Sequence, residues 1–508
     1  MTHDKPSPTA TGIAGLDDVL RGGFPPNRVY LIQGDPGAGK TTLGLQFLLE
    51  GGRLGEKSLY ISLSESKDEV LSVARSHGWN LAAIDLFEMQ VGEQEYSDAA
   101  ENTLFEPSEV ELREVMQRLL GEIERVKPSR VVFDSLSELR LLAQHPLRYR
   151  RQILALKQFF SGRKCTVLFL DDRTAPEEDR QLQSIVHGVL MLESSALDYG
   201  SERRRMRVVK IRGLQPRGGY HEFAIRTGGL QVYPRLVASE HVPPPNDKSE
   251  TLPSGVRELD KLLCGGIDRG TATLILGPAG SGKSSLALKY ALSAVSRGEP
   301  VELFAFDERI QTLLLRARGL GMDLDGALKS GKLSITQIDP AEMGPGEFVA
   351  NVSRSVFEKG VRVVVIDSLN GYLNAMPEER ALALQLHELL AVLNQNGVTT
   401  FLVMAQHGLL GPTMQSPIDV SYLADTVILM RYFEADGMVR KALSVLKKRS
   451  GSHEETIREY RMGAPDGIAV GRPLTGFRGI LTGVPSYVGG SERLMPKEPS
   501  APHLDGAE

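Results

Sequence analysis

The chain repeats itself: the segment from Gly12 to Glu65 aligns without a gap on the segment from Gly255 to Glu308. Every aligned pair is separated by 243 positions, and the matches fall on glycines, lysines and acids as well as on leucines. Shared helical periodicity does not produce such a match, so we interpret it as the duplication of one folding unit. The length of 508 residues agrees with two units, because single hydrophobic cores stop growing near roughly 250–300 residues.

Two shifts in composition mark the expected domain boundaries. Three consecutive prolines and a polar run interrupt the strand and helix patterns between the repeats, and Pro, Gly and charged residues dominate the end of the chain. Such segments form linkers or stay disordered because they bury little apolar surface. We expect an N-terminal domain over residues 1–240, a linker over 241–254, a C-terminal domain over 255–484 and a flexible tail over 485–508.

Each repeat alternates short apolar runs with amphipathic helix patterns, beginning with an apolar run, a glycine-rich loop and a helix. This alternation predicts an α/β fold with mostly parallel sheets flanked by helices. The expected strands are residues 28–34, 58–63, 130–135 and 165–172 in the first repeat and 271–277, 302–307, 361–368 and 399–406 in the second.

Both glycine-rich loops have the spacing of a P-loop: Gly, four residues, Gly, Lys, then Ser or Thr. The glycines let backbone N–H groups wrap phosphates, the lysine reaches the terminal phosphates, and the following hydroxyl ligates Mg²⁺. Two such loops at strand-to-helix junctions predict tandem RecA-like P-loop domains that bind ATP, rather than plain glycine-rich turns. The predicted ATP-binding residues are Gly34, Gly37, Gly39, Lys40, Thr41 and Thr42, then Gly277, Gly280, Gly282, Lys283, Ser284 and Ser285.

An apolar strand pattern in each repeat ends in an aspartate, Asp134 in the first and Asp367 in the second. In P-loop enzymes a carboxylate at such a strand end holds the magnesium. Buried strands also end in Asp for turn reasons alone, so the prediction depends on the neighbouring P-loop. We expect Asp134 to act with Thr41 and Asp367 with Ser284 as metal ligands.

Acids at one further strand end differ between the repeats. The first repeat has Glu65, while the second has the adjacent pair Asp307 and Glu308 at the same register. A carboxylate at this position can orient or deprotonate the nucleophile that attacks the γ-phosphate, so all three are candidate catalytic residues. The alternative is an acid that caps the following helix.

Composition narrows the class of protein. A formal net charge of −5 leaves no basic footprint for non-specific binding of nucleic acid. The one dense basic run, residues 201–207, is typical of a solvated face. Two cysteines are too few for a disulfide framework, and we find neither a signal-peptide pattern nor an apolar run that spans a membrane. These features favour a cytoplasmic protein.

With these motifs in place, the chain resembles the KaiC family of autophosphorylating clock ATPases from about Thr11 to Tyr487. The segments that carry the resemblance are residues 11–25 and 254–267 before the P-loops, then 74–81, 210–213 and 425–460. The resemblance implies a ring of six identical subunits with ATP and Mg²⁺ between neighbours. It also implies that a Lys-X-Arg pair contacts the nucleotide of the adjacent subunit. The matching residues are Lys210 and Arg212, then Lys447 and Arg449, which without the resemblance would be an ordinary solvated strand edge.

The resemblance also implies that the second domain phosphorylates two neighbouring hydroxyl residues just before an Asp-Thr-apolar run. The matching residues are Ser421 and Tyr422, and Ser416 matches a further family threonine. Tyr422 departs from the family's common threonine, which weakens the expectation of an ordered two-site cycle. Ser421 can also be read as a polar turn residue.

Two more departures bear on activity and partners. Ser64 replaces the first of two adjacent family acids, so hydrolysis in the first domain would be slow or would use Glu65. The tail has no recognisable version of the segment that engages the activator KaiA, so the resemblance favours a KaiB-like partner over KaiA.

Three functions compete at this stage. The first is an ATPase and serine autokinase whose phosphorylation state is read by partners in clock or stress signalling. The second is a DNA-associated recombinase or helicase, because the RecA-like fold serves those proteins too. The third is a scaffold that ATP assembles and in which hydrolysis is incidental.

Overall fold

A computed structural model of the chain describes residues 7–89, 107–173, 182–241, 250–373, 379–406, 421–463, 467–481 and 485–489. Its contacts divide the chain into two compact units, Met1–Arg235 and Leu236–Glu508. The boundaries expected at residues 240, 254 and 484 stay predictions, and the expected tail lies outside the described residues except for 485–489.

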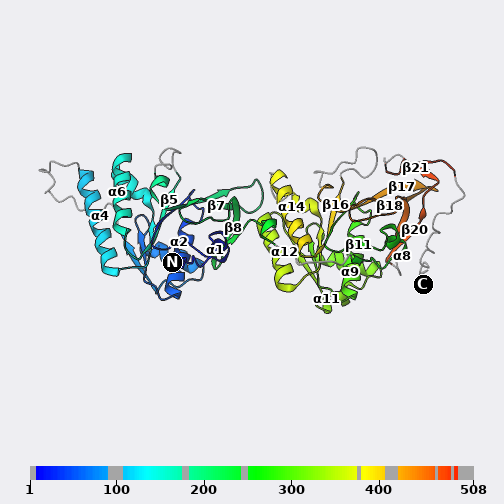
Figure 1. Ribbon diagram of the computed structural model, residues 1–508, viewed down its shortest axis with the longest axis horizontal. Helices are drawn as coiled ribbons and strands as arrows, with labels where there is room; N and C mark the ends of the chain where they lie inside the picture. Colours follow the sequence, from blue (N-terminus) through cyan, green and yellow to red (C-terminus); the bar gives the residue numbers. More distant parts are fainter. Residues whose placement is uncertain are drawn as a thin grey trace, which may run out of the picture. The chain divides into compact units, whose positions relative to one another are not determined.

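The N-terminal unit is built on a nine-stranded sheet with the order β3-β2-β4-β5-β1-β6-β7-β8-β9 (Figure 1). The first six strands in that order are parallel, and the last three run antiparallel. The strands are β1 (Val29–Gly34), β2 (Ser58–Ser62), β3 (Ile84–Glu88), β4 (Arg130–Asp134), β5 (Thr166–Asp172), β6 (Gly188–Ser195), β7 (Arg203–Ile211), β8 (Tyr220–Arg226) and β9 (Gly229–Tyr233).

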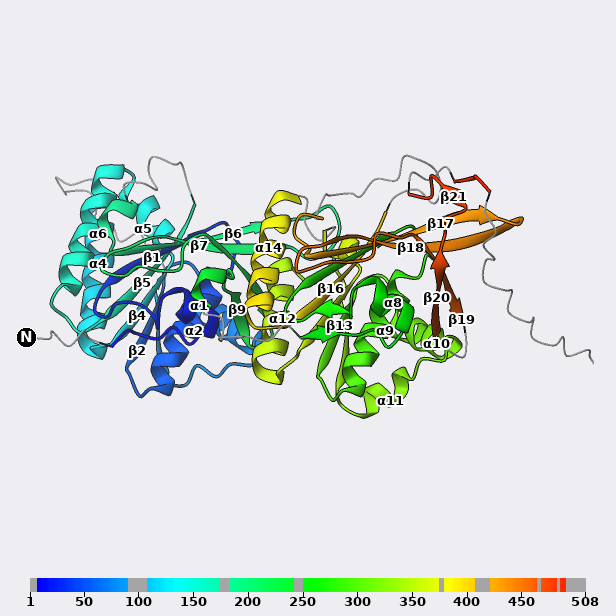
Figure 2. The ribbon, with the colours of Figure 1, turned by 45° about the vertical axis from the view of Figure 1, so that its right-hand side comes forward.

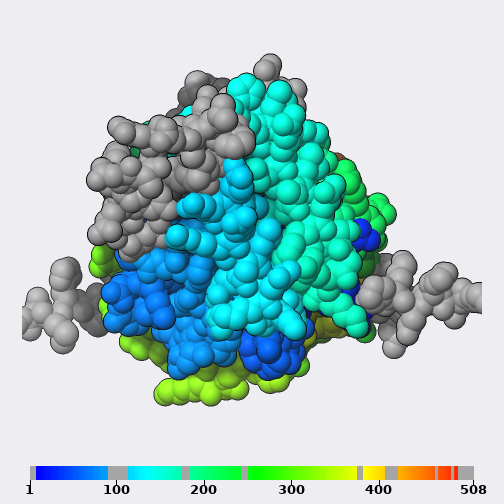
Figure 3. Space-filling view, turned by 90° about the vertical axis from the view of Figure 1, so that its left-hand side faces the viewer, coloured from blue at the N-terminus to red at the C-terminus, as the bar shows by residue number. Residues whose placement is uncertain are grey.

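Helices cover both faces of this sheet, as expected where parallel strands are buried on both sides. One core contains Val29 and Leu31 with residues of α4, α5 and α6, and the other contains Tyr30 and Ile32 with residues of α1, α2 and α3. Figure 2 shows α4 and α6 on one side of the strands and α1 and α2 on the other, and Figure 3 shows the cyan surface of α4 to α6. The helices are α1 (Ala14–Val19), α2 (Lys40–Arg53), α3 (Lys67–Ser76), α4 (Pro107–Val126), α5 (Leu136–Ala143) and α6 (Pro146–Phe160).

The C-terminal unit repeats the sheet with the order β14-β13-β15-β16-β12-β17-β18-β19-β20. The strands are β12 (Ala272–Gly277), β13 (Val301–Ala305), β14 (Leu333–Gln337), β15 (Val363–Asp367), β16 (Thr399–Ala405), β17 (Thr426–Ala435), β18 (Met438–Lys448), β19 (Arg458–Gly463) and β20 (Gly467–Pro473). Two small sheets pair β10 (Thr251–Leu252) with β11 (Ile267–Asp268) and β21 (Phe477–Arg478) with β22 (Ser486–Tyr487). The expected α/β fold, with mostly parallel sheets in two tandem domains, is confirmed.

The second sheet is also covered on both faces (Figure 2). Its two cores gather α8 to α11 on one face and α12 to α14 on the other. The helices are α8 (Arg257–Leu262), α9 (Lys283–Ser296), α10 (Ile310–Gly319), α11 (Leu324–Lys329), α12 (Pro345–Lys359), α13 (Leu369–Leu373) and α14 (Glu379–Gln395), with a 3₁₀ turn η2 (Ala238–Glu240) before them. The helices α2 and α9, and likewise α3 and α10, begin and end exactly 243 positions apart.

The short helix α1 packs closely on β9, and this contact generates a stability prediction. A Cβ on Gly15 would lie 2.0 Å from the carbonyl oxygen of Val232. We expect Gly15→Ala to lower the free energy of unfolding of the N-terminal unit by about 1–3 kcal/mol, the usual cost of overpacking. The only tryptophan of the chain, Trp79, packs on the core of this unit, so its fluorescence during urea denaturation reports this unit alone.

The matched control is Gly121→Ala in α4. A Cβ there meets nothing within 4 Å, so we expect it to raise stability by about 0.5–1 kcal/mol through better helix propensity. Equal midpoints for the two variants would contradict the close packing of α1 on β9.

Candidate nucleotide-binding site

The N-terminal glycine-rich loop joins the end of β1, at Gly34, to the first turn of α2. Gly37 and Gly39 have φ angles of 76° and 95°, which residues with a Cβ rarely adopt. A Cβ on Gly39 would also lie 2.6 Å from the side chain of Ile225 on β8. The loop therefore has the strand-to-helix placement and the bare backbone that phosphate binding requires.

Lys40, the first residue of α2, contacts two carbonyl oxygens and one carboxylate. It is 8% exposed, and its Nζ donates to the carbonyl oxygens of Gly34 and Asp35, each at 3.0 Å. It also forms an ion pair of 2.7 Å with Oδ1 of Asp172 at the end of β5. Sequence reasoning missed Asp172, because nothing local shows that the end of β5 lies beside the P-loop lysine.

The C-terminal loop has the same construction between β12 and α9. Gly280 and Gly282 have φ angles of 73° and 105°. A Cβ would lie 2.9 Å from Oη of Tyr432 at Gly280 and 2.5 Å from Sδ of Met462 at Gly282. Side chains from other strands of the same unit thus pack against each loop: from β8 in the first unit, and from β17 and β19 in the second.

Lys283 differs from Lys40 in its partners. Its Nζ donates to the carbonyl oxygen of Pro278 at 2.8 Å, and it forms no ion pair with a carboxylate among the described residues. The sheet register explains the difference, since Asp172 is opposite Gly34 whereas Ala405 is opposite Gly277. Burial lowers the pKa of Lys283 to about 8. A buried ammonium group without a carboxylate suits an anionic ligand such as a nucleotide's phosphates.

Each unit pairs a hydroxyl of the P-loop helix with the aspartate at a strand end. Thr41 Oγ1 donates to Oδ2 of Asp134 at 2.6 Å, and Ser284 hydrogen-bonds Asp367 in the same way. Burial raises the pKa of both carboxyl groups. Mg²⁺ in P-loop proteins takes one or two protein oxygens together with phosphate oxygens and water, so these donors fit it. No cage of three or more His, Cys, Asp or Glu residues occurs in the described part of the chain.

A tyrosine that the sequence did not single out joins the N-terminal pair. Tyr60 is buried on β2, and its Oη donates to Oδ2 of Asp134 at 2.6 Å. The position 243 residues later is Leu303, which has no hydroxyl. The two candidate metal sites therefore differ in how their aspartates are held.

The three candidate catalytic acids lie in different surroundings. Glu65 is half-buried, and its Oε2 has no hydrogen-bond partner in the described part of the chain. Burial raises the pKa of Glu65, with further contributions from Asp134 and Glu69. In the C-terminal unit Asp307 is exposed and accepts a hydrogen bond from Ser368. Both Oε atoms of Glu308, by contrast, accept hydrogen bonds from one arginine, Arg316.

The basic residues expected to contact a neighbouring chain's nucleotide lie at the opposite ends of the parallel strands from the P-loops. Lys210 is opposite Val189, near the start of β6, and Arg212 donates to the carbonyl oxygen of Ser184 at 3.1 Å. Since β6 runs parallel to β1, this edge is remote from the loop that follows β1. The N-terminal basic pair and the P-loop of the same unit are thus separated by the length of the strands.

In the C-terminal unit the same arrangement brings the candidate phosphoacceptors together with the basic pair. Lys447 donates to the carbonyl oxygens of Ser421 and Ala424 at 3.0 and 2.7 Å. Arg449 donates to the carbonyl oxygen of Tyr422 at 2.7 Å. Ser421 is partly buried and Tyr422 is 55% exposed. The third candidate, Ser416, lies outside the described residues.

Comparison with known proteins agrees with this geometry. The model of the KaiC ATPase family matches residues 9–237 and again residues 252–475. The chain belongs to the KaiC family. As a KaiC-family protein with two P-loops of the geometry described above, it is an ATP-binding protein of an ATPase family.

Among its relatives are several clock proteins of cyanobacteria. The chain is 27% identical over 491 residues to the circadian clock protein KaiC3 of Synechocystis sp., covering 95% of each chain. It is 26% identical to the circadian clock oscillator protein KaiC of Parathermosynechococcus lividus, with 95% of this chain and 89% of the relative covered. The KaiC of Prochlorococcus marinus is 25% identical, with 97% and 98% covered. None of the helices described here has the length and apolar character needed to cross a membrane.

Basic side chains surround the Lys-X-Arg pair of the N-terminal KaiC repeat. Arg28, Lys157 and His187 line a hollow of about 510 Å³ at this sheet edge. Burial and then the neighbouring cations lower the pKa of Lys157 and of Lys210, and the pKa of His187 falls to about 4 for the same reasons. His187 occupies the register position that Asp425 has in the second repeat, where Asp425 pairs with Arg449 at 3.6 Å. The sequence reading missed this difference, which the duplicated register alone reveals.

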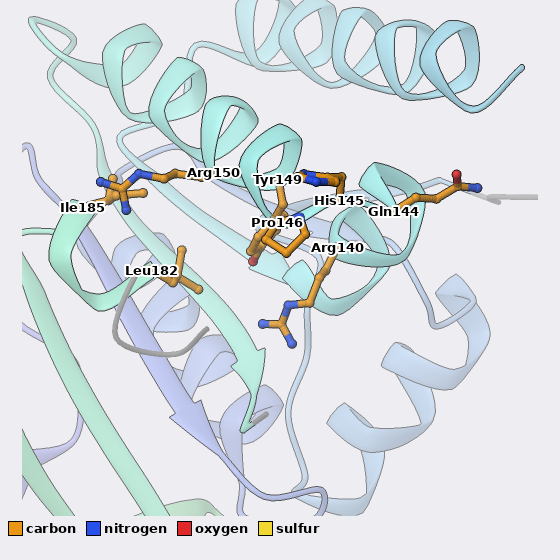
Figure 4. A pocket seen from close by; sticks show the side chains of 8 residues that line it. All are labelled: Arg140, Gln144, His145, Pro146, Tyr149, Arg150, Leu182 and Ile185. Atoms are coloured by element: carbon orange, nitrogen blue, oxygen red, sulfur yellow. The ribbon is translucent and has the colours of Figure 1, made fainter. Parts of the chain in front are cut away.

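A second hollow lies between α5, α6 and the segment before β6, and Figure 4 shows Arg140, Tyr149 and Leu182 around it. Its volume is about 130 Å³, whereas ligand sites for molecules of nucleotide size are usually about 300–1,000 Å³. Arg140 pairs with Asp171, next to the Asp172 that holds Lys40. This hollow is thus too small for a nucleotide.

The contrast between Asp172 and Ala405 predicts a gain of affinity. With the C-terminal site disabled by Lys283→Ala, we expect Asp172→Ala to tighten binding of a non-hydrolysable Mg-ATP analogue by about two- to fivefold. In the parent, Lys40 gives up its half-exposed ion pair with Asp172 when it binds the phosphates, and this pair is worth up to about 1 kcal/mol. In the variant there is no such pair to lose, so binding is tighter. Isothermal titration calorimetry measures the change.

Asp85→Ala is the matched control, because it removes the same charge from an exposed position on β3. It should leave the affinity unchanged. Weaker binding by Asp172→Ala would show instead that Asp172 holds Lys40 in its binding position.

Proposed function

We propose that this chain is an ATP hydrolase and serine autokinase that works as a homo-hexameric ring in clock or stress signalling. One observation carries the proposal: Lys447 and Arg449 hold the backbone of Ser421 and Tyr422 at the sheet edge opposite the P-loop of the same unit. A cytoplasmic location and a KaiB-like partner, rather than KaiA, are further parts of the proposal that rest on the family resemblance.

The topology supports transfer between subunits. Ser421 precedes the start of β17, while the P-loop follows the end of β12, and the two strands are parallel neighbours. Six residues of β-strand span roughly 20 Å, so the hydroxyl of Ser421 lies about that far from the phosphates that its own loop would bind. A head-to-tail contact between identical chains brings one chain's Ser421 edge to the next chain's P-loop, and such contacts form a ring where the rotation between neighbours closes. The number six comes from the family resemblance.

The residues of the C-terminal site can divide the chemistry of phosphoryl transfer. Oγ of Ser421 attacks the γ-phosphorus of ATP on the neighbouring chain, the bond to the β–γ bridging oxygen breaks, and ADP leaves with that electron pair. The serine proton passes to a carboxylate, for which Asp307 of that chain is available. Lys283 would neutralise charge on the phosphates. Mg²⁺, held by Ser284 and Asp367, would supply further charge neutralisation.

In the N-terminal site the proposed reaction is hydrolysis. Ser64 stands where the second repeat has Asp307, so Glu65 is the acid left to orient a water molecule. Its carboxylate is half-buried, Oε2 has no partner among the residues that the structure describes, and the pKa is raised by burial, all of which suit a general base.

The competing readings fit less well. In the basic run of residues 201–207, Arg204 pairs with Glu202 and Arg205 with Glu193, which leaves less charge for a nucleic-acid backbone. A scaffold assembled by ATP would need Asp134 and Asp367 to hold Mg²⁺, but it would not need Glu65 or Asp307 as a base. We therefore rank the DNA-associated ATPase and the scaffold below the autokinase.

Incubation with Mg-ATP tests the proposal directly. We expect phosphate on Ser421, detected by mass spectrometry, and its loss by at least about 100-fold in Lys283→Ala, because the transferred group loses its lysine contact. Lys40→Ala should impair phosphorylation far less, whereas a scaffold would lose assembly with either change. Hydrolysis of ATP without phosphate on Ser421 would refute the autokinase.

Mixing two inactive variants tests transfer between chains. Lys283→Ala chains carry an intact Ser421, and Ser421→Ala chains carry an intact P-loop. Mixed rings should regain phosphate on the Lys283→Ala chains only. Failure to complement, while each variant still assembles, would contradict the topological argument.

A further inference from the structure

The acid pair of the C-terminal site is bound unequally, and one arginine causes the difference. Arg316, on α10, donates from Nε to Oε1 of Glu308 at 3.1 Å and from Nη2 to Oε2 at 2.6 Å. Its Nη1 donates to Oγ of Ser285, in the first turn of α9, at 2.7 Å. Both side chains of the ion pair are about three-quarters buried. A two-pronged arginine–carboxylate pair of this kind fixes position as well as charge.

The adjacent acid is left for other contacts. Asp307 is exposed and accepts one hydrogen bond, from Ser368, which follows the candidate metal ligand Asp367. If Glu308 took a proton from a nucleophile, it would lose the negative charge that strengthens its hydrogen bonds from Arg316, so the ion pair makes Glu308 a weaker base. The ion pair therefore separates two carboxylates that the sequence alone treats as equivalent.

We propose that Arg316 is a positioning residue that withholds Glu308 from proton transfer and leaves Asp307 as the proton acceptor of the C-terminal site. This inference rests on the proposed function and names the acid that acts in it. Through Ser285 the same arginine ties α10 to the P-loop helix.

The first repeat supplies an internal comparison. At the same offset of 243 positions it has Val73 for Arg316, Thr42 for Ser285 and Glu65 for Glu308, and α3 and α10 have matching bounds. With valine in place of the arginine, Glu65 forms no ion pair among the described residues and keeps an unpartnered Oε2. Ser64, at the position of Asp307, has no carboxyl group. The N-terminal site thus uses Glu65, which corresponds to Glu308, whereas the C-terminal site uses Asp307, one position earlier. Whether the glutamate takes part depends on the residue at 73 or 316: valine leaves it available, and arginine binds it.

The nucleotide-free protein gives the first test, which does not depend on activity. Calorimetric unfolding of Arg316→Val, Glu308→Gln and the double variant measures whether the two side chains interact. We expect strong non-additivity: the double variant should unfold at a higher temperature than the sum of the two single shifts predicts. Additive shifts would overturn the ion pair and with it the proposal.

Turnover at the C-terminal site gives the second test, measured in a Lys40→Ala background as Ser421 phosphate plus released phosphate. Asp307→Asn should lower kcat by at least about 100-fold, and Glu308→Gln by less than about threefold. Arg316→Val should lower kcat by about tenfold or more, with KM for Mg-ATP changed less than about twofold. Arg316→Lys should recover part of the loss, and so should adding Glu308→Gln to Arg316→Val, because the released carboxylate is then gone.

If Arg316 served only the stability of the fold, removing its partner Glu308 would not restore the turnover that Arg316→Val loses. The proposal is overturned if Glu308→Gln loses as much turnover as Asp307→Asn, or if Glu308→Gln fails to rescue Arg316→Val. If the Lys40→Ala parent shows no turnover at all, the proposed function fails. The calorimetric coupling and the Val73→Arg experiment described next still decide the role of Arg316.

Moving the arginine to the first repeat is the third test. In a Lys283→Ala background, Val73→Arg should capture Glu65 and lower ATP hydrolysis by about tenfold or more, with the affinity for a non-hydrolysable analogue unchanged within about twofold. Val73→Met is the matched control, since it adds length without charge at a partly buried position and should hydrolyse at the parental rate. Unchanged hydrolysis in Val73→Arg would contradict the proposal.

Discussion

The rest of the structure depends on one constraint: in each unit the strand before the P-loop pairs in parallel with the strand that leads into the antiparallel part of the sheet. Because β1 pairs with β6 and β12 with β17 in the same direction, the loop after the first strand and the segment before the second lie at opposite edges. The same register sets Lys210 and Lys447 at the edge away from their own P-loops. No rotation of a side chain spans a distance of several strand residues. The proposed contact of each basic pair with a nucleotide therefore requires a nucleotide that is bound by another chain.

Within one repeated backbone the two halves have different charges at three positions. Asp172 occupies the register position of Ala405, His187 that of Asp425, and Val73 that of Arg316. Among the described residues, the P-loop lysine of the N-terminal half pairs with Asp172, whereas Lys283 of the C-terminal half forms no ion pair. The N-terminal basic edge has His187 where the C-terminal edge has Asp425, and only the candidate catalytic glutamate of the C-terminal half pairs with an arginine in the described part of the chain. Such differences change how strongly each site holds phosphates without changing the fold. They agree with different reactions in the two halves.

Local patterns predicted the fold and the loops, and contacts between distant segments were beyond them. The strand ending at Gly34 and the helix starting at Lys40 follow from short runs of apolar residues and glycines. The pairing of Tyr60 with Asp134 joins residues 74 positions apart on neighbouring strands, and that of Lys40 with Asp172 depends on strand order. Neither has a local signature. The exchange of Val73 for Arg316 was readable from the constant offset, but its meaning required the position of Glu308.

In the C-terminal unit one antiparallel strand, β18, connects the P-loop with the opposite ends of the parallel strands. In the C-terminal unit Lys441 of β18 donates to the carbonyl oxygen of Gly280 in the P-loop at 3.0 Å, and Tyr432 of β17 donates to that of Ala279 at 3.0 Å. Six residues further along β18, roughly 20 Å away, Lys447 holds the backbone of Ser421. One hydrogen-bonded strand thus contacts the loop that would bind a nucleotide and the segment that would meet a neighbouring chain.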